Sequence, residues 1–137
     1  AHETLRCPAS WPHSRCLVRI QEGICDIIAS AEPEVVAIEG VFHCRNIRTA
    51  MTLGQARGVA IGTCAGRGLQ VFEYAPRRVK QSVCGFGAAS KEQIARMIMT
   101  LLCLPEIPRT DEADALALAL CHFHSLTGVS ALAPEPI

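Results

Sequence analysis

A short apolar run that ends in a carboxylate constrains the fold of this chain more than any other feature. Residues 35–40 read VVAIEG, so four apolar residues lead directly into Glu39 and Gly40. A run that is apolar on both faces predicts a central strand covered on both sides. A helix is predicted just before it, over residues 14–31, from apolar residues at helical spacing, and Pro33 ends that helix. A helix followed by such a strand predicts an α/β fold with one sheet.

The remaining elements follow from local signals along the chain. LQVFEYA (residues 69–75) predicts a second strand, because it is rich in aromatic and β-branched residues. Asn46 and Pro76 are typical of helix starts, and Ser90 with Gln93 forms a capping box. Further helices are therefore predicted over residues 46–64, 76–83, 90–104 and 111–126. The 137 residues predict a single domain over 1–137, with residues 1–13 and 127–137 as loose ends.

Charge and cysteine content narrow the class of protein. Thirteen basic and thirteen acidic residues cancel, which argues against a generic polybasic binder but leaves room for local patches. No apolar run is long enough to cross a bilayer, so no membrane partner is expected. Eight cysteines without a CxxC pair argue against a zinc site and favour buried free thiols in a reducing cytoplasm. The start AHETLRCPAS has no initiator Met, so the chain is expected to be a fragment or a processed form.

Three glycines recur every four residues inside the second predicted helix. They are Gly54, Gly58 and Gly62, and each costs a helix up to about 1 kcal/mol. A row of glycines on one face predicts that another backbone packs very close to it. We therefore expect this helix to form an interface.

Acidic residues mark the start of the last predicted helix. Asp111 and Asp114 are three residues apart and share a helical face, while Glu112 points elsewhere. A purely structural interpretation is that Asp111 caps the helix and Asp114 complements the helix dipole. Glu39 also has a purely structural interpretation, because the ends of strands often reach solvent and are therefore often polar.

The acidic residues become more informative together. Ligands of open α/β sheets bind outside the carboxyl ends of the strands, where Glu39 lies. If the last helix packs there, three carboxylates converge and need a cation. Hard oxygen ligands favour Mg²⁺ or Mn²⁺, and carboxylates holding two such ions are suited to phosphodiester cleavage.

A nuclease also needs a surface for the phosphate backbone, and the sequence offers candidates. Individually each basic candidate is also explained as a solvated surface charge, and the aromatic one, Phe42, as a core residue. His122 and His124 are two residues apart and do not share a helical face, which disfavours a metal role. The predicted DNA-binding residues are Phe42, Arg45, Arg48, Arg77, Arg78, Lys80 and Lys91.

Four stretches, taken together, resemble the bacterial RuvC family of Holliday-junction resolvases. The resemblance runs in order from about Leu17 to His124. It implies an RNase H-like α/β fold with a mixed sheet flanked by helices. It also implies a homodimer and a Mg²⁺-dependent endonuclease that nicks two symmetric strands of a four-way junction in DNA recombination and repair. The stretches are VVAIEGVFHCRN, TLGQARGVAI, VFEYAPRRVKQSVCGFGAASKEQI and DEADALALA.

The resemblance assigns roles to single residues. Glu39, Asp111 and Asp114 match the family's metal-binding carboxylates, with two ions expected at each site. Lys80 and Lys91 match lysines that act on the DNA backbone and on the chemistry. Phe42 matches an aromatic near the cut site and Arg45 a neighbouring basic position. The glycine-rich helix, with Gly54, Gly58 and Gly62, matches the dimer interface, and the family implies RuvA and RuvB as partners.

One family feature has no counterpart in this sequence. RuvC-like enzymes begin with a strand that reads like GIDPG, whose aspartate is a fourth carboxylate. Asp26 does not replace it, because it falls within the first predicted helix. The chain is therefore expected to be N-terminally truncated relative to the family. The alternative function is a degenerate dimer that binds junction DNA without cutting it, and a further alternative is an unrelated α/β module.

Overall fold

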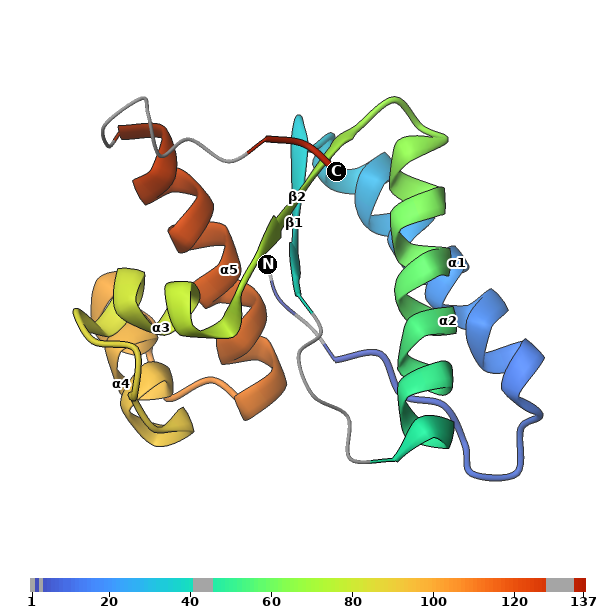
Figure 1. Cartoon of the computed structure of the whole chain (residues 1–137), viewed down its shortest axis with the longest axis horizontal. Helices are drawn as coiled ribbons and strands as arrows, with labels where there is room; N and C mark the ends of the chain where they lie inside the picture. The colour runs from blue at the N-terminus through green and yellow to red at the C-terminus, as the bar shows by residue number, and fades with distance from the viewer. Residues whose placement is uncertain (1, 3, 41–45, 128–134) are drawn as a thin grey trace. The chain divides into compact units, whose positions relative to one another are not determined.

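In the computed structural model the helices and strands follow the predicted order, with two helix–strand pairs and then three helices in the described part of the chain (Figure 1). The structure describes residues 2, 4–40, 46–127 and 135–137. The elements in this part of the chain are α1 (His13–Ala31), β1 (Val35–Glu39), α2 (Ile47–Ala65), β2 (Gln70–Tyr74), α3 (Pro76–Cys84), α4 (Lys91–Leu101) and α5 (Thr110–Thr127). The predicted α/β fold is confirmed.

The strands β1 and β2 are hydrogen-bonded neighbours in a sheet that has two strands in the described part of the chain. The Gly40 N–H donates to the Tyr74 carbonyl at 2.9 Å. Both residues lie at the carboxyl ends of their strands, so the strands run parallel, as a strand–helix–strand connection through α2 requires. Glu39 and Tyr74 therefore end the two strands at the same edge of the sheet.

Local capping signals fixed several helix starts correctly. The Asn46 side chain accepts from the Arg48 N–H at 2.8 Å, and Pro76 opens α3. At α4 both capping-box bonds form: Ser90 Oγ accepts from the Gln93 N–H, and the Gln93 side chain accepts from the Ser90 N–H. Lys91 directly follows Ser90, so this capping box fixes Lys91 as the first residue of α4.

One helix end differs from the prediction, and another lies where it was predicted but has a different cause. The predicted end of the fourth helix at Leu104 was wrong, because α4 ends at Leu101 and the chain turns at Cys103, whose φ is +50°. Pro105 therefore follows the turn and does not cause it. In the same way α1 ends in a left-handed residue, Glu32, with φ +44°, before Pro33 is reached.

By its internal contacts the chain divides into two compact units. The α1–α2 unit comprises Leu5–Val36, Val41–Val71 and Ile137, and the α3–α5 unit comprises Ala1–Thr4, Ala37–Gly40 and Phe72–Pro136. In the first, α1 packs on α2; in the second, α3, α4 and α5 pack on one another. The core of the α3–α5 unit includes Tyr74, Val79, Val83, Ile94, Ile98, Ala113, Ala117 and Cys121.

The glycine-rich face of α2 is open. A Cβ atom placed on Gly54, Gly58 or Gly62 would meet no atom within 4 Å. The close neighbour that the glycines predict is therefore not supplied by the described part of this chain.

The ends of the chain make defined contacts where they are described. His2 and Thr4 bond to Glu112, and Phe72 and Pro136 form an isolated antiparallel bridge. The assignment of residues 1–13 and 127–137 as loose ends, and of 1–137 as one domain, stays a prediction.

The cysteines are free thiols throughout the described residues, but the expectation that they are buried was correct for only two of them. Cys64 and Cys121 are buried, whereas Cys103 is exposed. Among the described residues, no helix is both long and apolar enough to cross a membrane.

Candidate active site

Glu39, the last residue of β1, is the centre of the candidate site. Burial raises the pKa of its carboxyl, and the negative charge of Asp114 raises that pKa further. The ammonium groups of Lys91 and Lys80 act in the opposite direction and lower it. A carboxylate responds in this way only when these charges are near. The structure therefore brings Glu39 together with Asp114 and both lysines, within the α3–α5 unit.

Asp114 reaches the same place from the first turns of α5. Its Oδ2 lies 3.6 Å from Nζ of Lys91, which begins α4. The Lys91 side chain is 68% exposed and that of Asp114 34% exposed, so solvent screens this ion pair and it contributes little to stability. The ion pair matters for the site because it holds the Lys91 ammonium group beside the two carboxylates.

Asp111 is not drawn into this cluster. It is exposed and lies three residues before Asp114 on α5, so spacing puts it on the same side of the helix. The helix begins at Thr110, so Asp111 is a first-turn residue and not the cap proposed as the structural alternative. No group of three potential metal ligands forms among the described residues. The expected convergence of three carboxylates is thus seen for Glu39 and Asp114 only.

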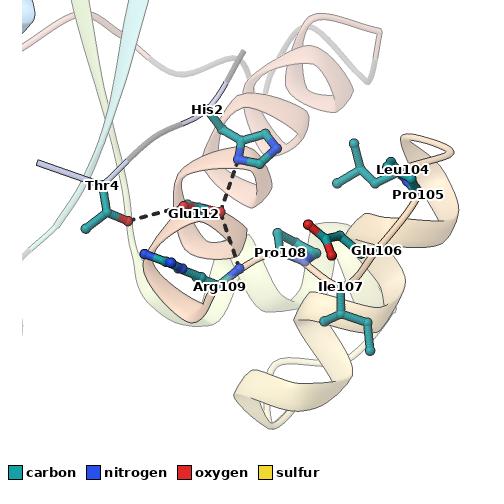
Figure 2. Close-up of a pocket in the computed structure, with 9 residues that line it drawn as sticks. All are labelled: His2, Thr4, Leu104, Pro105, Glu106, Ile107, Pro108, Arg109 and Glu112. Carbon is teal, nitrogen blue, oxygen red and sulfur yellow. Dashed lines mark hydrogen bonds and ion pairs between the residues drawn. The ribbon is translucent and has the colours of Figure 1, made fainter.

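Glu112 faces away from the site, as predicted. Its carboxylate accepts from Thr4 Oγ1 at 3.4 Å and from the Arg109 N–H at 3.4 Å, and lies 3.1 Å from His2 Nδ1 (Figure 2). These contacts place Glu112 on the wall of a pocket of about 470 Å³ that also includes Leu104, Pro105, Glu106, Ile107 and Pro108. Through these contacts Glu112 connects the N-terminal segment to the start of α5.

The pair Glu39 and Asp114 fits a hard divalent cation. Burial is the main reason why the pKa of Glu39 is raised, and repulsion from the nearby Asp114 carboxylate raises it further. Mg²⁺ keeps several waters and is bound through one or two carboxylates together with substrate phosphates. Two neighbouring carboxylates that both reach solvent are the donor set that such binding needs.

The three basic residues predicted on α3 have different surroundings. The positive charge of Lys80 partly offsets the rise that burial and Asp114 cause in the pKa of Glu39. Arg78 donates from Nη2 to Ser125 Oγ at 3.2 Å, and its guanidinium lies 5.3 Å from the centre of the Tyr74 ring. The stem of Arg77 covers Gly87, where a Cβ would lie 2.5 Å from the Arg77 Cγ. Arg78 therefore has a role in joining α3 to α5 that the sequence pattern did not indicate.

The other predicted DNA-binding residues are less informative. Phe42 and Arg45 lie outside the described residues. Arg48 is exposed at the start of α2, in the α1–α2 unit.

A buried polar pair was missed by sequence reasoning. The Tyr74 hydroxyl and His122 Nδ1 are 2.7 Å apart, and both residues are buried, at 1% and 4% exposure. Phe72 packs against the same imidazole with ring centroids 4.7 Å apart. Phe72 and Tyr74 are two residues apart in β2, so their side chains lie on the same face of the strand. This spacing was the signal in the sequence that could have indicated a shared partner. The pair joins the end of β2 to α5, the helix that carries Asp114.

Comparison with known proteins is consistent with this geometry. Residues 2–122 match the family described as "Crossover junction endodeoxyribonuclease RuvC". The RuvC of Caldicellulosiruptor saccharolyticus is 47% identical over 122 residues, covering 88% of this chain and 74% of that protein. The RuvC of Geobacter sp. strain M21 is 51% identical over 116 residues, covering 85% and 70%.

Solved structures agree. The Thermus thermophilus RuvC structure superposes with a TM-score of 0.84 at 32% identity, covering 98% of this chain and 80% of that one. The same protein in complex with Holliday junction substrate gives a TM-score of 0.85 at 31% identity, covering 98% and 82%. These matches confirm the expected RNase H-like fold.

Proposed function

Because this chain belongs to the RuvC family of crossover junction endodeoxyribonucleases, we propose that it resolves four-way DNA junctions by paired symmetric nicks. The observation that carries the proposal is the approach of Asp114 and Lys91 to Glu39 at the carboxyl end of β1. Two carboxylates and an ammonium group at a strand end suit the binding of a cation and a phosphodiester side by side.

In this proposal Glu39 and Asp114 hold the metal, and Asp111 joins them from the same side of α5. Two Mg²⁺ ions, or Mn²⁺ in their place, supply an activated water and neutralise charge on the phosphate when bound. Lys91 neutralises the charge that develops on the phosphodiester oxygens in the transition state. Lys80, on α3, adds a second positive charge near Glu39, since it too opposes the rise in the pKa of that carboxyl.

The proposed DNA contacts use the basic residues predicted from the sequence. Lys80, Lys91 and Arg77 contact backbone phosphates from the α3–α5 unit. Arg48 and Arg45 are proposed as further phosphate contacts, and Phe42 is proposed to stack on an unpaired base. Arg78 contributes through its positive charge while it joins α3 to Ser125 and Tyr74.

A homodimer is part of the proposal. A four-way junction presents two symmetric strands, and a two-fold dimer presents two identical sites. The open face of Gly54, Gly58 and Gly62 continues through Ile47 and Met51, which are 81% and 63% exposed. These residues follow one another at helical spacing, so they form one apolar stripe that suits a second copy. The cooperation with RuvA and RuvB and a cytoplasmic location rest on family membership alone.

The proposal is tested with a labelled synthetic junction. Mg²⁺ should produce paired nicks at symmetric positions, EDTA should abolish them, and a linear duplex of the same sequence should stay intact. Asp114→Asn should lose cleavage while retaining a gel shift with the junction, because it removes a metal ligand and no phosphate contact. A wild-type chain that shifts the junction in Mg²⁺ without nicking it supports the alternative, a binding protein without cleavage activity. A chain that neither binds nor cuts contradicts both.

A further inference from the structure

A second, smaller hollow lies beside the candidate site in the α3–α5 unit. Its volume is about 380 Å³, and it is lined by the first turns of α4 and by the segment that leads into α5. Lys91, Arg96 and Arg109 surround it, and Ala95 and Pro108, both buried, form its apolar floor. It shares Lys91 with the cluster at Glu39, so the two places are contiguous.

The two arginines of this hollow have no anionic partner among the described residues. The bond of Arg96 to Thr100 uses its main-chain carbonyl, and that of Arg109 to Glu112 uses its main-chain N–H. Neither guanidinium makes a hydrogen bond or ion pair in the part of the chain that the structure describes. Glu92 also lines the hollow, one turn before Arg96 on α4, but forms no ion pair there with that arginine.

This chemistry selects an oxyanion. A guanidinium presents a planar fork of donors that matches the oxygens of a phosphate. Thr110 lines the hollow and opens α5, an 18-residue helix whose amino end favours negative charge.

We propose that Arg96 and Arg109 bind, in this hollow beside Lys91, a backbone phosphate of the DNA strand that flanks the scissile phosphodiester. The inference rests on the proposed function and deepens it, because it assigns two residues that fix the strand next to the metal site. Arg96 and Arg109 grip one phosphate together, so losing both removes a single contact.

The salt dependence of junction binding tests the inference. Affinity is measured by fluorescence anisotropy with Ca²⁺ in place of Mg²⁺, from 50 to 200 mM NaCl. Each phosphate contact contributes about 0.9 to the slope of log Kd against log[NaCl]. Arg96→Gln and Arg109→Gln should each weaken binding, and the double variant should lower the slope by about 0.9 per bound protomer. At 50 mM salt that is roughly a tenfold loss of affinity.

Three further variants sharpen the test. Arg6→Gln removes the same charge from an exposed position in the α1–α2 unit and should leave the slope unchanged. Glu92→Gln removes the carboxylate of the hollow and should tighten binding by roughly twofold. Arg96→Lys should keep the slope but weaken binding, because the charge remains and the fork is lost.

The outcomes separate this inference from the proposed function. If wild type binds and cuts the junction but the double variant keeps the wild-type slope, the hollow is not a phosphate site and the nuclease proposal stands. A double-variant slope lowered by about 1.8 per bound protomer would show two separate phosphate contacts and overturn the shared grip. If wild type does not bind the junction, both proposals are wrong.

Discussion

The two units of the chain differ in how completely each buries its own apolar surface. In the α3–α5 unit Tyr74, Ile98 and Cys121 are fully buried. In the described part of the α1–α2 unit the buried apolar side chains are Cys64 and Val71, while Ile47 and Met51 are largely exposed. Burial of apolar surface is the main favourable term in folding and in association. Both units also expose large apolar side chains, for example Phe123 in one and Ile47 in the other. The difference between the units is therefore one of core size, and it fits the proposal that the α1–α2 unit gains further burial from a second copy.

The largest effect is expected in the α3–α5 unit from Glu39→Gln. Junction cleavage should fall roughly 10³-fold, because metal binding contributes several kcal/mol to transition-state stabilisation. Without metal the Tm should stay the same or rise, since the change removes the repulsion with Asp114. Mg²⁺ should raise the Tm of wild type and not that of the variant.

Single-turnover cleavage and thermal unfolding with and without Mg²⁺ measure these effects. Asp26→Asn is the matched control, because Asp26 is an exposed carboxylate of α1. A Glu39→Gln variant that keeps more than about a tenth of the wild-type rate would exclude Glu39 as a metal ligand.

The next effect tests the partner of the α1–α2 unit. Gly58→Arg should weaken dimerisation at least about a hundredfold, because an unpaired charge buried in an interface costs roughly 3–5 kcal/mol. Sedimentation equilibrium measures it. Thr52→Arg, an exposed position away from the glycine stripe on the same helix, should leave the association unchanged. Equal association of wild type and Gly58→Arg would mean that the stripe is not the interface.

A smaller effect is expected from the buried pair that joins β2 to α5. Tyr74→Phe leaves His122 Nδ1 buried without its partner, which costs about 1–3 kcal/mol in the free energy of unfolding. Urea unfolding measures the loss. Thr52→Val, which deletes an exposed hydroxyl bonded to the Arg48 carbonyl at 3.1 Å, should cost no more than about 0.5 kcal/mol. Similar losses in both variants would refute a special role for the pair.

The smallest effect is a pH dependence that comes from His122. Burial lowers the pKa of His122 below its usual 6.5, so the unfolded chain binds this proton at a higher pH than the folded chain does. Stability is therefore fully present above about pH 6.5 and falls as the pH drops through the lowered folded pKa, by at most about 1.4 kcal/mol per pH unit. Urea unfolding at pH 7.5 and 5.5 should show the gap between wild type and His122→Gln narrowing at low pH. A gap independent of pH would contradict a neutral buried His122.

Much of the candidate site was predictable because its parts have local signals. Glu39 was found from the apolar run that it ends, and Lys91 stands directly after the capping box of α4. Asp114 was predicted from its spacing to Asp111, but only packing decides that α5 brings Asp114 near Glu39. The roles of Arg78 and His122 depend on Ser125 and Tyr74, 47 and 48 residues away, so no local pattern reveals them.

The sequence by itself determined the order and type of the elements, the helix caps and the residue types at the strand end, because these depend on neighbours within a few positions of the chain. Tertiary structure alone decided that Asp114 lies near Glu39, that Arg78 is held against Tyr74, and that the glycine face of α2 stays open. Those outcomes depend on how elements distant in the chain pack, and packing is a property of the folded arrangement as a whole.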